Sequence, residues 1–306
     1  MNNVPAPIVL FVYNRPWHTQ QTVEALQKNK LASESELFIY SDDAKNDDAR
    51  VSVDEVRKYI DNITGFKKIT VIKRDKNWGL ANSIIDGVTK IVNEYGKIIV
   101  LEDDLVTSPY FLKFMNEALE FYKDEKKIWH ISGWNYPIET AGLNNVFLWR
   151  LMNCWGWATW ANRWEYYEKD VYKTINEFTN DDIKRFNLDG TEGFWGQVTA
   201  NKANKINTWA ILWYATIFKQ NGLCLNPSQT YVENIGHDGS GIHCGESDSY
   251  SNTLSSLKNI NISCTLSENQ LAFQKIQYFY KKQKKSLLVR VINKLSRIIF
   301  KRNIIK

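Results

Sequence analysis

The first part of the chain alternates short apolar runs with longer amphipathic segments, and this alternation constrains the fold more than any other feature. The apolar runs have the length and branched residues of buried strands, and the segments between them have helical spacing. Strand-like runs cover 7–13, 36–43, 68–74 and 97–104, and helix-like segments cover 18–28, 51–63, 79–96 and 108–123. This order predicts an α/β fold in which a mixed, mostly parallel sheet is flanked by helices.

The chain after residue 125 is less regular. Residues 128–165 hold short strand-like runs and loops rich in tryptophan, and residues 205–222 have helical spacing. Two further helices are predicted over 268–283 and 286–300. Ligands of open α/β sheets collect at the carboxyl ends of the strands, so the polar residues that follow the strands of the first part are the first candidates for a site.

The positive charge of the chain is concentrated at its C-terminal end. The 306 residues carry a net charge of +5, but residues 281–306 hold ten Lys and Arg and no acidic residue. The rest of the chain, with 29 basic and 34 acidic residues, lacks the basic character of a nucleic-acid-binding protein. Residues 284–300 predict a basic amphipathic helix that contacts an anionic membrane surface through 284–302. The alternative is that this helix packs on the domain or on a second copy.

The cysteines and the N-terminus bear on where the protein resides. Cys154, Cys224, Cys244 and Cys264 lie far apart without a CxxC pair, which fits a reducing compartment. The N-terminal residues lack the basic region and the apolar length of a signal peptide. No run approaches the roughly 20 apolar residues of a spanning helix. The sequence therefore predicts a cytoplasmic protein that is peripheral on the inner face of the cell membrane.

Three consecutive carboxylates, Glu102, Asp103 and Asp104, close the strand-like run 97–104. Adjacent carboxylates repel, and those near a core need a positive partner to stay charged. A solvated turn explains such a triplet equally well in isolation. At the end of a buried strand, a site for a hard divalent cation, Mn²⁺ or Mg²⁺, is favoured. Strand alternation would then place Glu102 and Asp104 on one side.

Two other strand ends carry groups suited to a phosphate or a base. Asn14 and Arg15 follow the first strand and precede a helix start, which suits an anion, although an ordinary surface arginine is the simpler reading. Asp42 and Asp43 follow the second strand, where a carboxylate could accept from a pyrimidine N–H or merely form a polar turn. Asn82 lies in the first turns of a later helix. Neither GxGxxG nor GxxxxGK[ST] occurs, which argues against a dinucleotide fingerprint and a P-loop.

Six segments together resemble a bacterial set of GT-A fold glycosyltransferases, similar to the N-acetylglucosaminyltransferase I type with its Glu-Asp-Asp motif. They are FVYNRP (11–16), YSDDAKN (40–46), NWGLANSI (77–84), LEDD (101–104), WGWATW (155–160) and NIGHDGSGIHC (234–244). We therefore expect a GT-A domain over 1–265, with a nucleotide-binding half (1–125) and an acceptor-binding half (126–265), followed by basic, membrane-associating helices over 266–306.

The resemblance also implies roles for individual residues. The implied donor-binding residues are Tyr13, Asn14, Arg15, Asp42, Asp43, Asn82, Glu102 and Asp103. The first three would line the nucleotide pocket, and one of the two aspartates after the second strand would hold the base. Asp104 would be the main metal ligand, with His243 near the metal or the diphosphate. The acceptor wall would include Trp155, Gly156 and Trp157.

One position departs from the pattern of that family. The segment NTWAILW (207–213) resembles Ser-Trp-Asp-x-x-Trp, whose aspartate is the expected general base, but this chain has Ala210 there. Alanine cannot take the proton of an acceptor hydroxyl. Three explanations are open: a deliberate replacement that traps a substrate complex, a naturally impaired chain, or another carboxylate as the base. The candidates for that carboxylate are Glu192, Glu233 and Asp238.

The resemblance implies an inverting, metal-dependent transfer of a sugar from a nucleotide diphosphate sugar to a hydroxyl. The transferred group would be a hexosyl or N-acetylhexosaminyl group and the nucleotide UDP. The acceptor would be a glycan or a lipid-linked precursor in the synthesis of surface polysaccharide, such as lipopolysaccharide or capsule. The alternative is a protein that binds a sugar nucleotide or glycan without turnover, which Ala210 would explain.

Overall fold

The computed structural model of the chain describes residues 4–239 and 249–283. Within them, a large mixed sheet has the strand order β3-β2-β1-β4-β8-β6-β9-β7, and a small sheet pairs β10 with β5. The strands are β1 (Ile8–Val12), β2 (Glu36–Ser41), β3 (Lys68–Lys73), β4 (Lys97–Glu102), β5 (Leu105–Thr107), β6 (Ile128–Ser132), β7 (Val146–Trp149), β8 (Trp157–Trp160), β9 (Leu223–Pro227) and β10 (Val232–Asn234).

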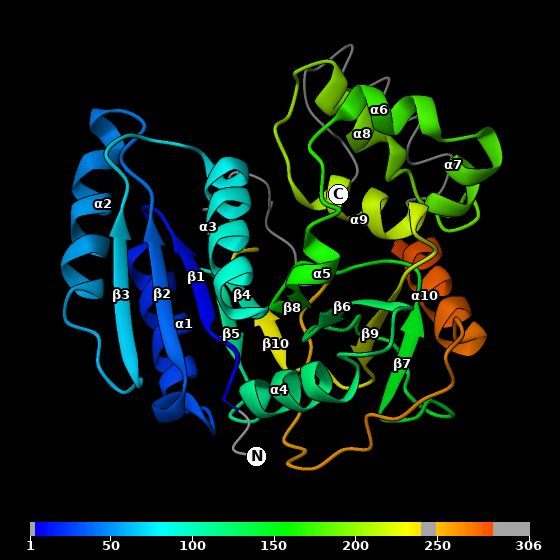
Figure 1. The fold of residues 1–306 in the computed structure, drawn as a ribbon, viewed down its shortest axis with the longest axis horizontal. Helices are drawn as coiled ribbons and strands as arrows, with labels where there is room; N and C mark the ends of the chain where they lie inside the picture. The colour runs from blue at the N-terminus through cyan, green and yellow to red at the C-terminus, as the bar shows by residue number, and fades with distance from the viewer. Residues whose placement is uncertain (1–3, 240–248, 284–306) are drawn as a thin grey trace.

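Helices flank the large sheet and gather beyond one of its ends (Figure 1). Those of the first part are α1 (Pro16–Gln27), α2 (Asp47–Ile60), α3 (Leu80–Tyr95) and α4 (Phe111–Phe121). Those of the second part are α5 (Ala161–Trp164), α6 (Val171–Glu177), α7 (Asn180–Phe186), α8 (Trp195–Lys202), α9 (Ala210–Lys219) and α10 (Gln270–Gln283). Figure 1 shows α6 to α9 together on the side away from α4.

The predicted strands and helices of the first part are confirmed. Strands β3, β2, β1 and β4 are parallel neighbours in that order. Across the sheet, the chain steps in one direction from β1 through β2 to β3, and it then crosses back past β1 to form β4. Because such crossovers are right-handed, the return reverses the covered face, so α1 and α2 lie on one face and α3 on the other. This reversal beside β1 creates the crevice at which α/β sheets bind ligands.

The second part extends the sheet with strands of both directions. Strand β8 is antiparallel to β4 and to β6, β9 is parallel to β6, and β7 is antiparallel to β9. Helix α10 contacts β7, so the C-terminal part of the described chain is packed on the same sheet.

The predicted helix over 268–283 is confirmed as α10, whereas the predicted helix over 286–300 lies outside the described residues. Within the described ranges, none of the helices combines the length and apolarity needed to cross a membrane.

A cluster of aromatic rings forms the core between β6, β8 and α9. The His130 ring stacks on Trp157 at 5.4 Å between ring centroids, and the Trp213 indole N–H donates to His130 Nδ1 at 3.3 Å. His130 Nε2 donates in turn to the Asn153 carbonyl oxygen at 2.9 Å. Both ring nitrogens are therefore satisfied in the neutral tautomer with the proton on Nε2. Complete burial lowers the pKa of His130 to about 3.

We expect His130 to make the fold less stable in acid. In the unfolded chain a histidine titrates near its ordinary pKa of about 6.5, so between pH 6.5 and 3 only the unfolded state takes up this proton. The free energy of unfolding should fall by about 1.4 kcal/mol per pH unit in that range, or about 2 kcal/mol between pH 6.5 and 5. Chemical denaturation of the native protein and of His130→Gln at both pH values measures the effect. Equal pH dependence in the two proteins would contradict it.

Candidate functional site

The carboxyl ends of three neighbouring strands bring the predicted site residues of the first part together. Strand β1 lies between β2 and β4, with Val12 level with Ser41 and Phe11 level with Glu102. The chain leaves β1 through Tyr13–Arg15, β2 through Asp42–Asp43 and β4 through Asp103–Asp104. Three segments that are distant in the sequence therefore meet at one edge of the sheet.

Arg15 joins the ends of β1 and β4. Its Nη2 donates to Asp104 Oδ2 at 2.8 Å and also bonds Asp103 Oδ1. Asp103 is 6% exposed and Asp104 is 7% exposed, so both carboxylates are buried. The prediction that Glu102 and Asp104 act together relied on strand alternation, but β4 ends at Glu102 and a turn follows. Strand alternation stops there, and the carboxylates that converge are those of Asp103 and Asp104.

The cluster holds more negative charge than Arg15 balances. Burial raises the pKa of Glu102, and Asp104 and Asp103 raise it further. Burial also raises the pKa of Asp103. Arg15 opposes this shift, and Asp104 increases it. The pKa of Arg15 is itself raised: its burial works against the charge, but the two aspartates outweigh that effect. A further cation at this point would therefore be stabilised.

The chain after β10 closes over this cluster. The Ile235 N–H donates to the Asp104 carbonyl oxygen at 2.9 Å. A Cβ atom on Gly236 would lie 2.2 Å from Asp104 Oδ2 and 3.0 Å from Arg15 Nη1. Only glycine fits here, because the backbone itself lies against the carboxylate. Sequence reasoning did not single out Gly236, although the Gly-rich segment 234–244 that contains it was part of the resemblance.

The two aspartates after β2 have different partners. Asp42 is buried and accepts from the backbone N–H groups of Trp78 at 2.8 Å and Gly79 at 2.9 Å, so it fixes the turn before α3. Asp43 pairs with Arg50 at 2.8 Å and with Arg57 at 3.2 Å. The hydrogen bond from Arg50 is the main reason that the pKa of Asp43 is lowered.

The other predicted donor residues lie around this turn. The Tyr13 hydroxyl accepts from the Lys45 N–H at 3.1 Å, and the Tyr13 N–H points at Asp103 Oδ2 over 3.4 Å. Asn14 is half-buried in the same turn after β1. Asn82 Oδ1 accepts from Lys169 Nζ at 3.2 Å, and the same ammonium donates to Asn207 Oδ1 at 2.6 Å. Lys169 thus connects the first turn of α3 with the segment that leads into α9.

The donor atoms at the end of β4 suit a hard cation, but they form an incomplete set. Asp103 Oδ1 and Asp104 Oδ2 both bond Arg15 Nη2, so a cation would need oxygens of these carboxylates that Arg15 does not occupy, and oxygen is the ligand that Mn²⁺ and Mg²⁺ prefer. Across residues 4–239 and 249–283, no group of three or more His, Cys, Asp or Glu could hold a metal ion. The two carboxylates therefore fit a cation whose other ligands come from a bound molecule. His243, predicted near the metal, lies outside the described residues.

Ala210 is the first residue of α9 and lines a pocket of about 410 Å³. Helix α9 begins later than the predicted start at residue 205, because Asn204 has a left-handed φ of 53° and Asn201 Oδ1 accepts from the Thr208 N–H at 3.0 Å. These features hold residues 204–208 as a loop. Trp155 lines the same pocket, together with Tyr136, His237 and Tyr280.

Of the three residues predicted on the acceptor wall, only Trp155 lines this pocket. Trp157 is 1% exposed and stacks on Trp209 at 5.1 Å between ring centroids, so it belongs to the core. Gly156 has a φ of 62°, and a Cβ atom there would lie 2.8 Å from Val232 Cγ2. Strand β8 begins at Trp157 and turns that ring inward, which explains why neighbouring tryptophans have different surroundings.

The three carboxylates considered as alternative bases each have neighbours that the structure identifies. Glu233 accepts from Ser251 Oγ at 3.2 Å, and Asp238 pairs with His18 Nε2 at 3.0 Å. Glu192 is near Tyr280: burial raises the pKa of Tyr280, and Glu192 contributes to that shift. None of the three is among the described residues that line the Ala210 pocket.

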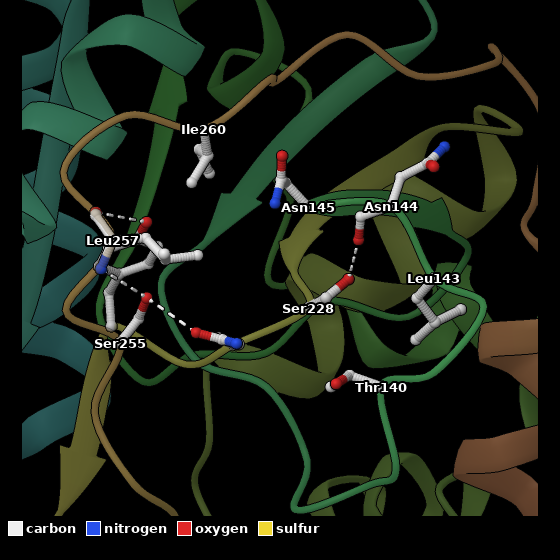
Figure 2. Close-up of a pocket in the computed structure, with 10 residues that line it drawn as sticks. Thr140, Leu143, Asn144, Asn145, Ser228, Ser255, Leu257 and Ile260 are labelled. Carbon is white, nitrogen blue, oxygen red and sulfur yellow. Dashed lines mark hydrogen bonds between the residues drawn. The ribbon is translucent and has the colours of Figure 1, made fainter.

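A second cavity, of about 90 Å³, has a structural explanation (Figure 2). Several of its polar groups are paired: Ser228 Oγ donates to the Asn144 carbonyl oxygen, and Ser255 Oγ donates to Gln229 Oε1 at 3.4 Å. The Tyr231 hydroxyl also donates to the Leu257 carbonyl oxygen at 3.1 Å. These bonds attach the segment around residues 255–260 to the sheet, so we do not consider this cavity a functional site.

We expect Arg15→Met to destabilise the protein strongly, because it leaves buried carboxylates without their partner. Breaking a buried ion pair from one side costs about 3–5 kcal/mol. The control is Arg50→Met, which removes the arginine of an ion pair in which Arg50 is 45% exposed and should destabilise the protein far less, because exposed ion pairs contribute little. Chemical denaturation of both variants measures the difference. Similar losses of stability in the two variants would contradict a larger contribution of the buried Arg15 ion pairs.

Comparison with known proteins identifies the family to which the chain belongs. Residues 8–188 match the model of the family described as Glycosyl transferase family 2. No curated protein matches the sequence. Similar solved structures include the mannosyltransferase PcManGT from Pyrobaculum calidifontis in complex with GDP-Man and Mn²⁺. It has 10% sequence identity and a TM-score of 0.42, and the match covers 72% of each chain.

Residues 1–349 of TarS from S. aureus, in complex with UDP-GlcNAc, have 10% identity and a TM-score of 0.43. That match covers 74% of this chain and 57% of the TarS chain. The predicted α/β fold class is confirmed: a large, mixed and mostly parallel sheet is flanked by helices, and a C-terminal helix is present. Since the family match spans more than half of its residues, this chain belongs to glycosyl transferase family 2.

Proposed function

We propose that the chain is an inverting, metal-dependent glycosyltransferase that uses a nucleotide diphosphate sugar, with UDP as the nucleotide. The observation that carries the proposal is the buried Arg15, Asp103 and Asp104 cluster at the switch point of a family 2 domain, beside a separate aromatic pocket. A cluster with spare negative charge suits a cation and a diphosphate, and the pocket suits an acceptor. The transferred group would be a hexosyl or N-acetylhexosaminyl group, as the resemblance to the N-acetylglucosaminyltransferase I type implies.

On the donor side, Tyr13, Asn14 and Arg15 would line the nucleotide pocket. Asp42 holds the turn before α3 through the backbone N–H groups of residues 78 and 79, and this turn would position Asp43 toward the base. Asn82, in the first turn of α3, would face the ribose or the sugar. The carboxylates of Glu102 and Asp103 would contact the ribose and the donor sugar, as their place at the end of β4 allows.

Asp104, with Asp103 beside it, would hold Mn²⁺ or Mg²⁺. Such an ion, when bound, neutralises the charge that develops on a diphosphate leaving group. Arg15 would remain as a fixed positive charge beside the ion, and the Gly236 backbone would limit access of water to Asp104. In the transfer itself an acceptor hydroxyl attacks the anomeric carbon as the bond to the diphosphate breaks, and the hydroxyl proton goes to a base.

The base is the part of this mechanism that the chain does not supply at its expected place. Ala210 is the first residue of α9, where the partial positive charge of a helix N-terminus would favour a carboxylate. With alanine there, Trp155 and its pocket could still bind an acceptor while transfer is slow. Two explanations fit alanine at this position. A carboxylate outside the described lining of the pocket could serve as the base, or the base of this chain could have been replaced.

The acceptor would be a glycan or a lipid-linked precursor of surface polysaccharide. Residues 284–302, which continue the chain from α10, carry the basic charge that would attach the protein to the inner face of the membrane. That segment lies outside the described residues, so its role rests on its composition.

A second function has one observation in its favour. A sugar-nucleotide or glycan-binding protein without turnover would need the same donor and acceptor surfaces but no base, and Ala210 provides none.

We expect UDP-sugar binding to depend on a divalent cation. Calorimetry against a panel of UDP-sugars should show binding with Mn²⁺, and the affinity should fall about 30-fold or more after chelation, because the diphosphate then meets uncompensated carboxylates. Asp104→Asn should show the same weak binding with and without Mn²⁺. Equal affinity before and after chelation of the native protein would contradict a metal-assisted donor site.

We expect Ala210→Asp to increase the rate of sugar transfer by about 10²–10⁴-fold, which is the usual contribution of a general base. The measurement is release of UDP from a UDP-sugar in the presence of candidate glycan acceptors. Ala210→Asn is the matched control, since it has the shape of aspartate but cannot take the proton. If the native protein and Ala210→Asp both bind the UDP-sugar and neither turns it over, the binding-protein alternative is favoured.

A further inference from the structure

Three buried nitrogen atoms without a hydrogen-bond partner among the described residues belong to side chains that line the Ala210 pocket. They are Trp134 Nε1, Asn153 Nδ2 and His237 Nε2. Trp134 is 3% exposed and Asn153 is 8% exposed, so neither can be satisfied by bulk water. A buried donor without an acceptor costs free energy, and such groups in native proteins usually serve a bound molecule or an ordered water.

The surrounding contacts fix these groups in place. Asn153 Oδ1 accepts from the Tyr136 hydroxyl at 3.2 Å, and the Asn153 carbonyl oxygen accepts from His130 Nε2. The amide oxygen is therefore in use, and its NH₂ group is left for a ligand. The Trp134 ring meets Trp155 edge to face at 4.6 Å between ring centroids, so its orientation is also set by packing.

Helix α10 contributes to the same pocket. The Tyr280 hydroxyl lies 2.7 Å from the Tyr136 hydroxyl, and both rings line the pocket. The hydroxyl of Tyr136 thus connects Tyr280 on α10 with Asn153. The walls of the pocket come from segments as far apart in sequence as residues 134 and 280.

The described part of the lining argues against a charged ligand. Among the residues that the structure describes around the pocket there is no Asp, Glu, Lys or Arg. An ionised group inside would lose its hydration without gaining a counter-charge. Aromatic faces combined with a few fixed donors suit a molecule that has an apolar face and a rim of hydroxyl groups. A volume of about 410 Å³ is in the range of small-molecule sites.

We infer that this pocket binds an uncharged pyranose whose hydroxyl oxygens accept from Trp134 Nε1 and Asn153 Nδ2. Its ring would lie against the aromatic wall to which Trp155 and Tyr280 contribute. This inference rests on the proposed function in one respect: it identifies the bound sugar as part of the acceptor. It specifies a neutral hexose or N-acetylhexosamine there rather than a uronic acid, and it makes α10 part of the acceptor site.

The test uses simple methyl glycosides as probes. The full-length protein, with ¹⁵N-labelled tryptophan, is titrated with the methyl pyranosides of glucose, galactose, mannose and N-acetylglucosamine. The methyl glycosides of glucuronic and galacturonic acid serve as charged counterparts. We expect a neutral glycoside to shift the Trp134 indole N–H signal, and its acidic counterpart to bind at least about tenfold more weakly.

Two variants remove the donors: Asn153→Asp keeps the shape of the side chain, whereas Trp134→Phe also makes the ring smaller. Trp134→Phe and Asn153→Asp should each weaken binding of the neutral glycoside about tenfold, the effect of one lost hydrogen bond. The control is Trp160→Phe, because the Trp160 indole donates to the Leu119 carbonyl oxygen at 3.1 Å and Trp160 is not among the described lining residues. Tyr280→Phe, which removes only the hydroxyl bonded to Tyr136, should also weaken binding. Thermal melting verifies that each variant is folded.

The outcomes separate this inference from the proposed function. If no glycoside binds, or if all variants bind equally, the three nitrogens hold water only and the inference is overturned, whatever the nucleotide sugars do. If a neutral glycoside binds as described but no nucleotide sugar binds with or without Mn²⁺, the pocket is a saccharide site and the transferase proposal fails. Preferred binding of the acidic glycosides would also overturn the inference.

Discussion

The bond between Arg15 and the two aspartates after β4 holds the candidate site together. Two buried carboxylates at adjacent positions would not stay charged without a cation within hydrogen-bond distance. Arg15 supplies that cation from the neighbouring strand, so the ends of β1 and β4 are fixed to each other. The Gly236 backbone brings a third segment of the chain against the same Asp104 carboxylate.

The site divides into a charged part and an uncharged part. The charged part lies at the ends of β1, β2 and β4, where burial and mutual repulsion raise the pKa of Glu102 and Asp103. The uncharged part is the aromatic pocket next to α9, in which the described lining carries no ionised side chain. Lys169 connects α3 with the segment before α9, since its ammonium bonds Asn82 on one side and Asn207 on the other. The proposed transfer reaction would give this division a purpose, because a diphosphate and a sugar hydroxyl need different surroundings.

The first half of the fold could be predicted from the sequence, and the second half only in part. The runs that became β1 to β4 are continuously apolar and the intervening helices are periodic, so local sequence determines them. The insertion of β8 between β4 and β6 depends on pairing between distant short segments, which no periodicity reveals. The same limit applies within the site. The position of Arg15 at a strand end was predictable, but its bonds to Asp103 and Asp104 were not, because they depend on the turn that follows β4.

The tryptophan-rich segment shows why residue type alone did not locate the pocket. Trp155 and Trp157 are two residues apart, yet only Trp155 lines the pocket while Trp157 packs between His130 and Trp209. Trp134 and Asn153 have no feature in the sequence that marks a missing hydrogen-bond partner, since that property exists only once the chain is folded.

The contact between Tyr280 and Tyr136 has a practical consequence for anyone who shortens the chain. Residues 266–283 look dispensable in the sequence, as the beginning of a basic tail, but α10 closes one side of a cavity and packs on β7. Cutting before residue 266 would expose Tyr136 and the rings around it to solvent and invite aggregation. A truncation that starts after Gln283 removes most of the basic residues of the C-terminal tail and leaves α10 in place.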